Sequence, residues 1–532
     1  KYPSREVTVA ASVSEEQSSD KSRASGTYSA SFEVLIKEAL ATSVSSVTEE
    51  ELGRFKYLSM RKGEAGWMIT YSFENPIVAA EQGQDADINV VVCQEALELQ
   101  DIAALPQLEY LNLDHTELPE GSLETLSSLK MITCDYIQLD MLRLALGDAA
   151  NGLERLNASH LKSLEELSYF PGLKSLEMED CREISDISAL AQVKDLENLK
   201  LYDMDEVNDF TVLNVLKKLG SLSIDAENLK DISFINHMPE LASLGITDSK
   251  ILLLDPLVGK ESLKELVLVD NGEVRDYNPV GTLTGLETLV INKYTSQEDP
   301  DLTALTGLKH GEFHGMMGIR FLGSLTGLEE LKVQGCNVDQ PSVIASLPAL
   351  KKLTYRKNWG NSDDLSFLAG CQGLTCLDMN HSEFYGDVSY AFNLPALETL
   401  ILDSSSFEVK FDRLQDNPAL KALSLNHVKL YKNIEMWSDG MVRSINYDDV
   451  LLDEYTSFLG HYPSLEYLSL RGNQLTDLQF AAGLKNLREL DVTDNYVTDT
   501  HVLDQLEYLG KDSTVKRPMA DVDWIDTVED SH

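Results

Sequence analysis

The 532-residue sequence predicts an α/β solenoid, one long array of short repeats, in place of several globular domains. The pattern apolar-x-x-apolar-x-apolar recurs along most of the chain, as in Leu263-Leu266-Leu268. Its first position falls at 108, 129, 153, 173, 196, 219, 241, 263, 286, 308, 328, 350, 374, 397, 420, 441, 465 and 487, about 22 residues apart on average. A repeat this short cannot bury its apolar side chains alone, so a fixed period of this length is typical of stacked arrays.

Each repeat is predicted to start with a short strand and to return through a short turn. The last two apolar positions of the pattern are two residues apart, which places both on one side of an extended chain. A second signal follows, as in Asp186-Ile187 and Asp231-Ile232, each continuing to an apolar residue three positions further on. Aspartate suits a cap there, and about 22 residues leave room only for a short helical or 3-10 turn.

The two ends of the array show different patterns. Residues 32–40 carry apolar side chains at helical spacing, and Thr48 with Glu51 forms a capping-box signature, which together predict a helical cap. We therefore expect a flexible Ser-rich tether at 1–26, the N-terminal helical cap with the first degenerate repeats at 27–100, and the repeat array at 101–498. Residues 499–532 are expected to form a C-terminal cap and an acidic tail.

The repeats resemble the 22-residue bacterial leucine-rich repeats of the internalin type, best seen at 465–473 and 487–495. The resemblance covers about residues 30–505 and implies a curved leucine-rich-repeat solenoid, with a parallel β-sheet on its concave face. It also implies a surface or secreted protein of a Gram-positive bacterium that binds host or matrix macromolecules. The asparagine that ends the motif appears at Asn271, Asn358, Asn473 and Asn495, and Cys181 and Cys336 take its place in two other repeats.

Composition excludes several kinds of partner. The chain has 44 Lys plus Arg against 88 Asp plus Glu, a net charge of -44 that repels nucleic acid and anionic membrane surfaces. No stretch is long and apolar enough for a membrane-spanning helix, so no membrane insertion is expected. The chain starts at Lys1 without a signal peptide, and a lipid anchor ahead of it would fit the Ser-rich tether. We expect a monomer that is extracellular or anchored to the cell surface.

The middle repeats differ in charge from the acidic first half. Residues 293–357 hold eight Lys plus Arg against seven Asp plus Glu, and Gly311 replaces a core apolar residue, which predicts a weakened or bent strand. One reading is random drift between repeats. The other is a patch that docks a partner with acidic or polar groups, with Trp359 as an aromatic anchor. The predicted ligand-binding residues on the concave face are Lys293, His310, Glu312, His314, Lys332, Lys352, Arg356, Lys357, Trp359 and His381.

No catalytic or cofactor site is predicted. His310, Glu312 and His314 alternate along one strand, but two histidines four residues apart are separated by about 13 Å, too far to share one ion. The sequence contains no nucleophile elbow, phosphate loop or zinc-protease motif, so it is not expected to be an enzyme. The leading hypothesis is non-catalytic recognition of a protein ligand on the concave face. An intracellular protein–protein scaffold and a polysaccharide binder are the alternatives.

Overall fold

The computed structural model describes residues 8–9, 28–82, 84, 86–113, 118–293, 298–431, 434–436, 442–445 and 451–509. Most of the predicted tether and the tail from residue 511 lie outside these residues. The repeat predicted to start at 441 is wrong, because Val442–Ile445 pairs antiparallel with Ile434–Met436 and adds no strand to the parallel array. The chain divides into two compact units, unit 1 (Lys1–Leu252) and unit 2 (Leu253–His532), and we describe each by itself.

Unit 1 begins with the predicted helical cap, α1 (Ala30–Leu40) and α2 (Glu49–Leu52). The Thr48–Glu51 capping box is present: Glu51 accepts the Thr48 N–H at 2.9 Å, and Thr48 Oγ1 accepts the Glu51 N–H at 3.3 Å. The next elements are β2 (Tyr57–Gly63), β3 (Gly66–Ser72), α3 (Pro76–Glu81) and β4 (Asn89–Cys93). Strand β3 pairs antiparallel with both β2 and β4, whereas β2 starts the parallel array by pairing with β5. Strand β1 (Thr8–Val9) pairs with β4.

The parallel strands of unit 1 follow the predicted repeat, and each pairs with the next at the same repeat position, as Leu222 does with Leu244. They are β5 (Tyr110–Leu113), β6 (Met131–Asp135), β7 (Arg155–Ser159), β8 (Ser175–Glu179), β9 (Asn198–Leu201), β10 (Ser221–Asp225) and β11 (Ser243–Thr247). The chain returns through α4 (Leu99–Ala103), α5 (Leu139–Leu146), η1 (Gly147–Gly152), η2 (Glu165–Tyr169), η3 (Ser188–Gln192), η4 (Thr211–Val215) and η5 (Ser233–His237), where η marks a 3-10 turn.

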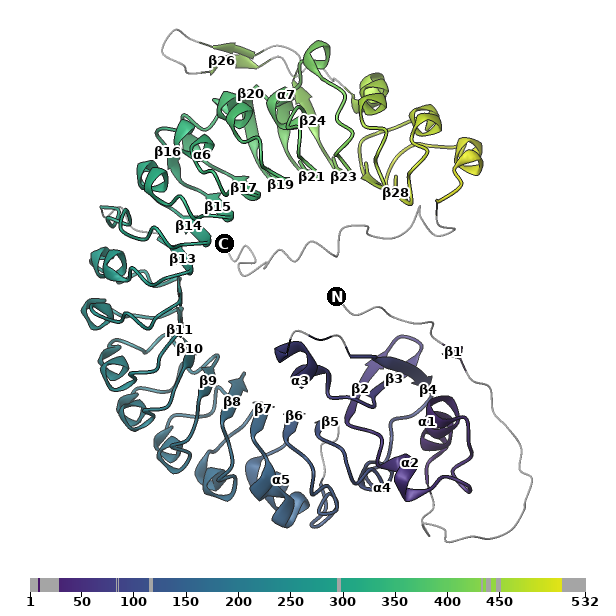
Figure 1. Ribbon diagram of the computed structural model, residues 1–532, viewed down its shortest axis with the longest axis vertical. Coiled ribbons are helices and arrows are strands. Elements are labelled where there is room, and N and C mark those ends of the chain that lie inside the picture. The colour runs from purple at the N-terminus through teal and green to yellow at the C-terminus, as the bar shows by residue number, and fades with distance from the viewer. Residues whose placement is uncertain are drawn as a thin grey trace. The chain divides into compact units, whose positions relative to one another are not determined.

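Unit 2 repeats this arrangement (Figure 1). Its parallel strands are β12 (Glu265–Val269), β13 (Thr288–Asn292), β14 (His310–His314), β15 (Glu330–Gln334), β17 (Lys352–Arg356), β19 (Cys376–Asp378), β21 (Thr399–Ile401), β23 (Ala422–Ser424), β27 (Tyr467–Ser469) and β28 (Glu489–Asp491). The turns are η6 (Asp255–Leu257), η7 (Asn278–Thr282), η8 (Arg320–Ser324), α6 (Ser342–Ala345), η9 (Leu365–Gly370), α7 (Ser389–Phe392), η10 (Phe411–Arg413), η11 (Leu452–His461), η12 (Gln479–Gly483) and η13 (His501–Gln505).

Unit 2 also carries strands outside the main sheet. Strands β16 (Asn337–Val338) and β18 (Trp359–Gly360) pair with each other, and β20 (Glu383–Asp387), β22 (Ser406–Glu408) and β24 (Lys429–Tyr431) form a second small sheet. Strands β25 (Ile434–Met436) and β26 (Val442–Ile445) form a hairpin between β24 and η11. Strand β23 pairs directly with β27, so this hairpin is an insertion between two neighbouring repeats.

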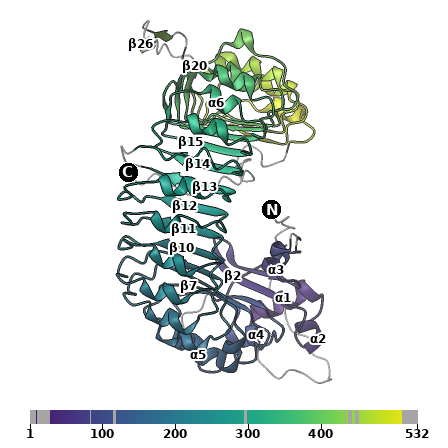
Figure 2. The same ribbon diagram turned by 60° about the vertical axis from the view of Figure 1, so that its left-hand side comes forward.

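Alternation along each strand separates the core from a second face of the sheet. In β10, Leu222 and Ile224 are buried between the sheet and the helical turns, whereas Ser221, Ser223 and Asp225 point the other way. We call this second face, formed by the first, third and fifth residue of each strand, the open face. Figure 2 shows the strands of each unit stacked side by side.

Turn chemistry joins each repeat to the next. Asp494 has a left-handed φ of 57°, and the Asn495 side chain that follows accepts the N–H of Asn473 at 2.8 Å and donates to the Leu470 carbonyl at 2.9 Å. The predicted capping aspartates also act as expected, since Asp186 accepts the Ser188 N–H at 2.7 Å. The predicted leucine-rich-repeat architecture, with its parallel sheet, short turns and helical cap, is confirmed.

Candidate functional site

The ten predicted site residues all belong to unit 2, but they do not form one surface. Six lie on the open face of three neighbouring strands: His310, Glu312 and His314 on β14, Lys332 on β15, and Lys352 and Arg356 on β17. Lys293, Lys357 and His381 each follow a strand of the main sheet. Trp359 lies on β18, outside the main sheet, with 48% of its surface exposed.

Lys293 does not have the surface position that its sequence context predicted. It is only 1% exposed, and its Nζ lies 2.9 Å from Asp299 Oδ1. The same Asp299 oxygen accepts the Met317 N–H at 3.0 Å. A buried ammonium group is stable only when it is paired, so Asp299 is what allows Lys293 to turn inward and away from the open face.

Glu330 of β15 joins two of the predicted residues. Its Oε2 lies 3.3 Å from His310 Nδ1 on β14, and its Oε1 lies 2.7 Å from Lys352 Nζ on β17. The three residues are direct neighbours across the sheet, because His310 pairs with Glu330 and Glu330 with Lys352 in the strand register. This row therefore crosses three strands and contains its own counter-charge.

Glu312 of β14 pairs with two more of the predicted site residues. Its Oε1 lies 2.6 Å from His314 Nε2 on the same strand and 2.9 Å from Lys332 Nζ on β15. Burial alone would raise the pKa of Glu312, but the hydrogen bond from His314 and the positive charge of Lys332 outweigh it and lower that pKa below the usual value. Glu312 is therefore held as a carboxylate.

Arg356 is paired as well. Its guanidinium makes a two-pronged contact with Asp378 of β19, in which Nε lies 3.2 Å from Oδ1 and Nη2 contacts Oδ2. Asp378 is 1% exposed. Lys332, Lys352 and Arg356 thus all have carboxylate partners within the open face. The sequence signal was a neutral-to-basic stretch in an acidic chain, and the folded surface pairs these three basic residues with Glu312, Glu330 and Asp378.

Two half-exposed valines lie beside these ion pairs, and sequence reasoning missed them. Val267 of β12 pairs with Val290 of β13, which in turn pairs with Glu312 of β14. All three occupy the third position of their strands, so they form one row on the open face. Polar residues usually fill this position on a solvated face. The valines in Leu266-Val267-Leu268 and Leu289-Val290-Ile291 were therefore the sequence signal from which this row could have been predicted.

The predicted weakening of β14 at Gly311 is wrong. Strand β14 pairs with β13 and with β15 over five residue pairs each. The ring of Phe313, which is fully buried, fills the space that a larger residue at 311 would take, since a Cβ on Gly311 would lie 2.7 Å from Phe313 Cε2. The sheet is continuous through the candidate site.

Neither a metal centre nor a membrane helix is found in the described parts of the chain. Among these residues, no group of three or more His, Cys, Asp or Glu is arranged to hold a metal ion. His310 and His314 pair with different glutamates, so they do not form a common ligand set. Within the same residues, no helix is both long and apolar enough to cross a bilayer.

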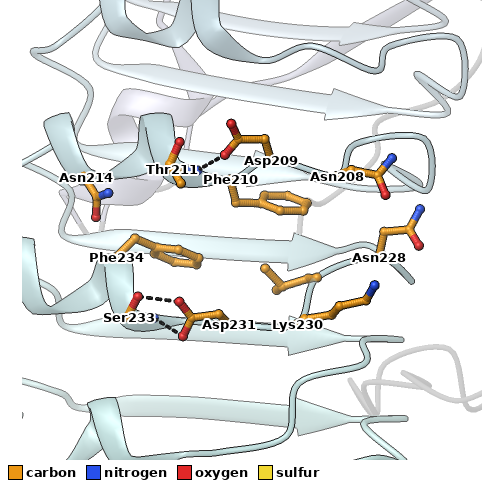
Figure 3. Close-up of a pocket in the computed structure, with 11 residues that line it drawn as sticks. Asn208, Asp209, Phe210, Thr211, Asn214, Asn228, Lys230, Asp231, Ser233 and Phe234 are labelled. Carbon is orange, nitrogen blue, oxygen red and sulfur yellow. Dashed lines mark hydrogen bonds between the residues drawn. The ribbon is translucent and has the colours of Figure 1, made fainter.

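Unit 1 contains a small cavity of about 190 Å³ on its helical side, between η4 and η5 (Figure 3). The buried side chains of Phe210, Leu229 and Phe234 line it, and Asp209 and Asp231 stand at its rim. Both carboxylates are already engaged, because Asp209 accepts the Thr211 N–H at 2.9 Å and Asp231 the Ser233 N–H at 3.0 Å. The cavity lies between two neighbouring repeats, and none of the predicted site residues lines it.

Comparisons with known proteins agree with this architecture. Residues 463–505 match the family of leucine-rich repeats described as two copies. No curated relative matches the sequence. Similar solved structures include an internalin (inlF) of Listeria monocytogenes, 21% identical, which covers 68% of this chain and 87% of its own with a TM-score of 0.39. A leucine-rich-repeat protein of Leptospira interrogans is 16% identical and covers 77% and 96%, with a TM-score of 0.41.

The functional domain of InlJ from Listeria monocytogenes is also similar, with 15% identity, coverage of 82% of both chains and a TM-score of 0.38. The regular repeats and their parallel strands give the chain a leucine-rich-repeat fold, and the family model matches this fold at residues 463–505.

Proposed function

We propose that this chain is a non-catalytic recognition protein that binds a protein ligand on the open face of β12 to β17. The observation that carries the proposal is the row of Val267, Val290 and Glu312, where half-exposed apolar side chains adjoin charged ones that are already paired. Protein interfaces combine an apolar centre with a polar rim in this way. Leucine-rich-repeat proteins generally act in protein–protein recognition.

The built-in ion pairs sharpen the expected chemistry of the ligand. An acidic group alone would have to displace Glu312 from Lys332 or Glu330 from Lys352. A ligand that places an apolar side chain over Val267 and Val290, and hydrogen-bonding groups over the paired charges, loses no such contact. The paired side chains also need little further ordering on binding, which favours affinity.

The same proposal covers where this chain is located and what kind of partner it binds. The internalin-type repeats support a bacterial protein that is secreted or anchored at the cell surface, where a lipid anchor is one means of attachment. The net charge of -44 supports a protein partner and not a nucleic acid. We expect the chain to act as a monomer.

Affinity capture with matched variants tests the proposal. Val290→Arg places a bulky charge in the middle of the row, and Ser223→Arg places the same charge at the third position of β10 in unit 1 as the control. We expect the wild type and Ser223→Arg to capture the same proteins from bacterial surface and host extracts. We expect Val290→Arg to fail to capture them. Capture of the same proteins by all three forms would contradict a ligand site at Val290.

A further inference from the structure

In each unit, one repeat position forms a column along the edge of the sheet where the strands begin. It is the residue directly after the first apolar position of the repeat, and we call it the edge column. Within each unit its members are adjacent in space, because each donates its backbone N–H to the carbonyl of the preceding member of that unit. Lys309 donates to Glu287 at 2.9 Å, for example, and Glu329 to Lys309 at 2.8 Å.

Charges alternate along this column. In chain order its members in unit 1 are Lys56, Glu109, Lys130, Glu154, Lys174, Glu197, Gly220 and Ala242. In unit 2 they are Lys264, Glu287, Lys309, Glu329, Lys351, Thr375, Glu398, Lys421, Glu466 and Arg488. Within each unit, wherever two neighbours in the column are both charged, they are opposite in sign.

Side-chain contacts follow the alternation. Glu154 bridges Lys130 at 3.1 Å and Lys174 at 3.2 Å, and Glu287 bridges Lys264 at 3.7 Å and Lys309 at 2.6 Å. The further pairs are Lys56–Glu109 at 3.0 Å, Glu329–Lys351 at 2.7 Å, Glu398–Lys421 at 3.0 Å and Glu466–Arg488 at 3.1 Å. The charges on Lys264 and Lys309 hold the pKa of Glu287 below its usual value, chiefly through its hydrogen bond with Lys309.

The overall composition does not explain this order. Acidic residues outnumber basic ones by 88 to 44 in the chain, yet the column holds eight basic residues and seven acidic ones. Exposed ion pairs add little stability one by one. Their larger effect is to discriminate between arrangements, because a wrong neighbour puts like charges side by side along an edge where the backbone keeps them close.

We propose that the edge column determines which repeats stack on one another, since a repeat with an acidic column residue accepts a neighbour with a basic one. The repeats share nearly the same apolar pattern, so their cores alone discriminate poorly between correct and shifted stacking. The column supplies that discrimination. This role concerns assembly of the solenoid and is independent of the proposed ligand.

Two variants separate this role from a general effect of charge. Glu287→Lys changes the net charge from -44 to -42 and creates three successive lysines in the column. Inverting the whole run between Ala242 and Thr375, with Lys264→Glu, Glu287→Lys, Lys309→Glu, Glu329→Lys and Lys351→Glu, changes the net charge to -46 but keeps the alternation. Glu273→Lys, at an exposed turn residue, is the control with net charge -42.

We expect the thermal midpoint of Glu287→Lys to fall below those of the wild type and of Glu273→Lys, and the inverted variant to regain most of the loss. Moderate salt should shrink these differences, because it screens exposed charges. General self-repulsion of an acidic chain predicts the opposite order, with Glu287→Lys above the inverted variant. Finding that opposite order, or equal midpoints for Glu287→Lys and Glu273→Lys, would overturn the proposal.

Discussion

The small residue Gly311 is compensated by the large residue Phe313 on the same strand, and this compensation gives the sharpest test of the packing at the candidate site. In the register of the sheet, Leu289 and Leu331 flank Gly311, whereas Ile291 and Val333 flank Phe313. Strand β14 thus carries a small residue where its neighbours carry a leucine, and a large one where they carry a branched aliphatic. Gly311→Leu adds a side chain whose Cβ alone would lie 2.7 Å from Phe313 Cε2 and 3.2 Å from Leu328 Cδ2.

We expect Gly311→Leu to destabilise the chain by about 1–3 kcal/mol through overpacking. Phe313→Ile should also cost about 1–3 kcal/mol, because it leaves a void where the fully buried ring was. The double variant restores the arrangement of the flanking strands, so its cost should fall below the sum of the two by at least about 1 kcal/mol. Urea unfolding of the four proteins measures this coupling. Strictly additive costs would refute the reasoning that the Phe313 ring occupies the space missing at Gly311.

Two further predictions concern the ion pairs of the open face. Asp378→Ala leaves the largely buried Arg356 without its counter-charge and should lower the free energy of unfolding in urea by about 3–5 kcal/mol. The double variant Asp378→Leu with Arg356→Met should recover much of that loss. A cost within about 0.5 kcal/mol of zero for Asp378→Ala would argue against the pair. The second concerns pH. His314 and Lys332 lower the pKa of folded Glu312, so its stabilising effect is present above the ordinary glutamate pKa and is lost as pH falls through the folded value. Below pH 4.5 the wild type should lose more stability than Glu312→Gln in thermal unfolding, and parallel pH profiles would contradict this.

Sequence alone was sufficient for the fold apart from the inserted hairpin at β25 and β26, because the apolar period sets both the strands and the stacking of the repeats. It was insufficient for the charge of the candidate site. Counting residues over 293–357 showed a neutral-to-basic stretch, but it did not show which charges pair across the sheet. Glu330 lies between His310 and Lys352 only once the repeats are stacked in register. Aligning the repeats one under another would have placed these three residues at the same position.

Lys293 and Gly311 show a second limit. Both were interpreted from residue type alone, as a surface cation and as a weak point in a strand. Lys293 is instead buried in an ion pair with Asp299, six residues further along the chain. The space beside Gly311 is filled by the ring of Phe313, two residues away. In each case a partner close in sequence reverses the usual behaviour of the residue. Such compensation depends on side-chain conformation, which periodicity does not report.

The alternating edge column has a consequence for how such an array changes over evolutionary time. Gain or loss of a single repeat inside a charged run, for example between Lys264 and Lys351, brings two like charges together, whereas gain or loss of two preserves the alternation. A pair of repeats is then the natural unit of duplication within a run. An uncharged position relaxes this rule, and Thr375 stands between a run that ends on lysine and one that starts on glutamate. Such positions are where segments of different origin could be joined, and where repeats could be grafted by design.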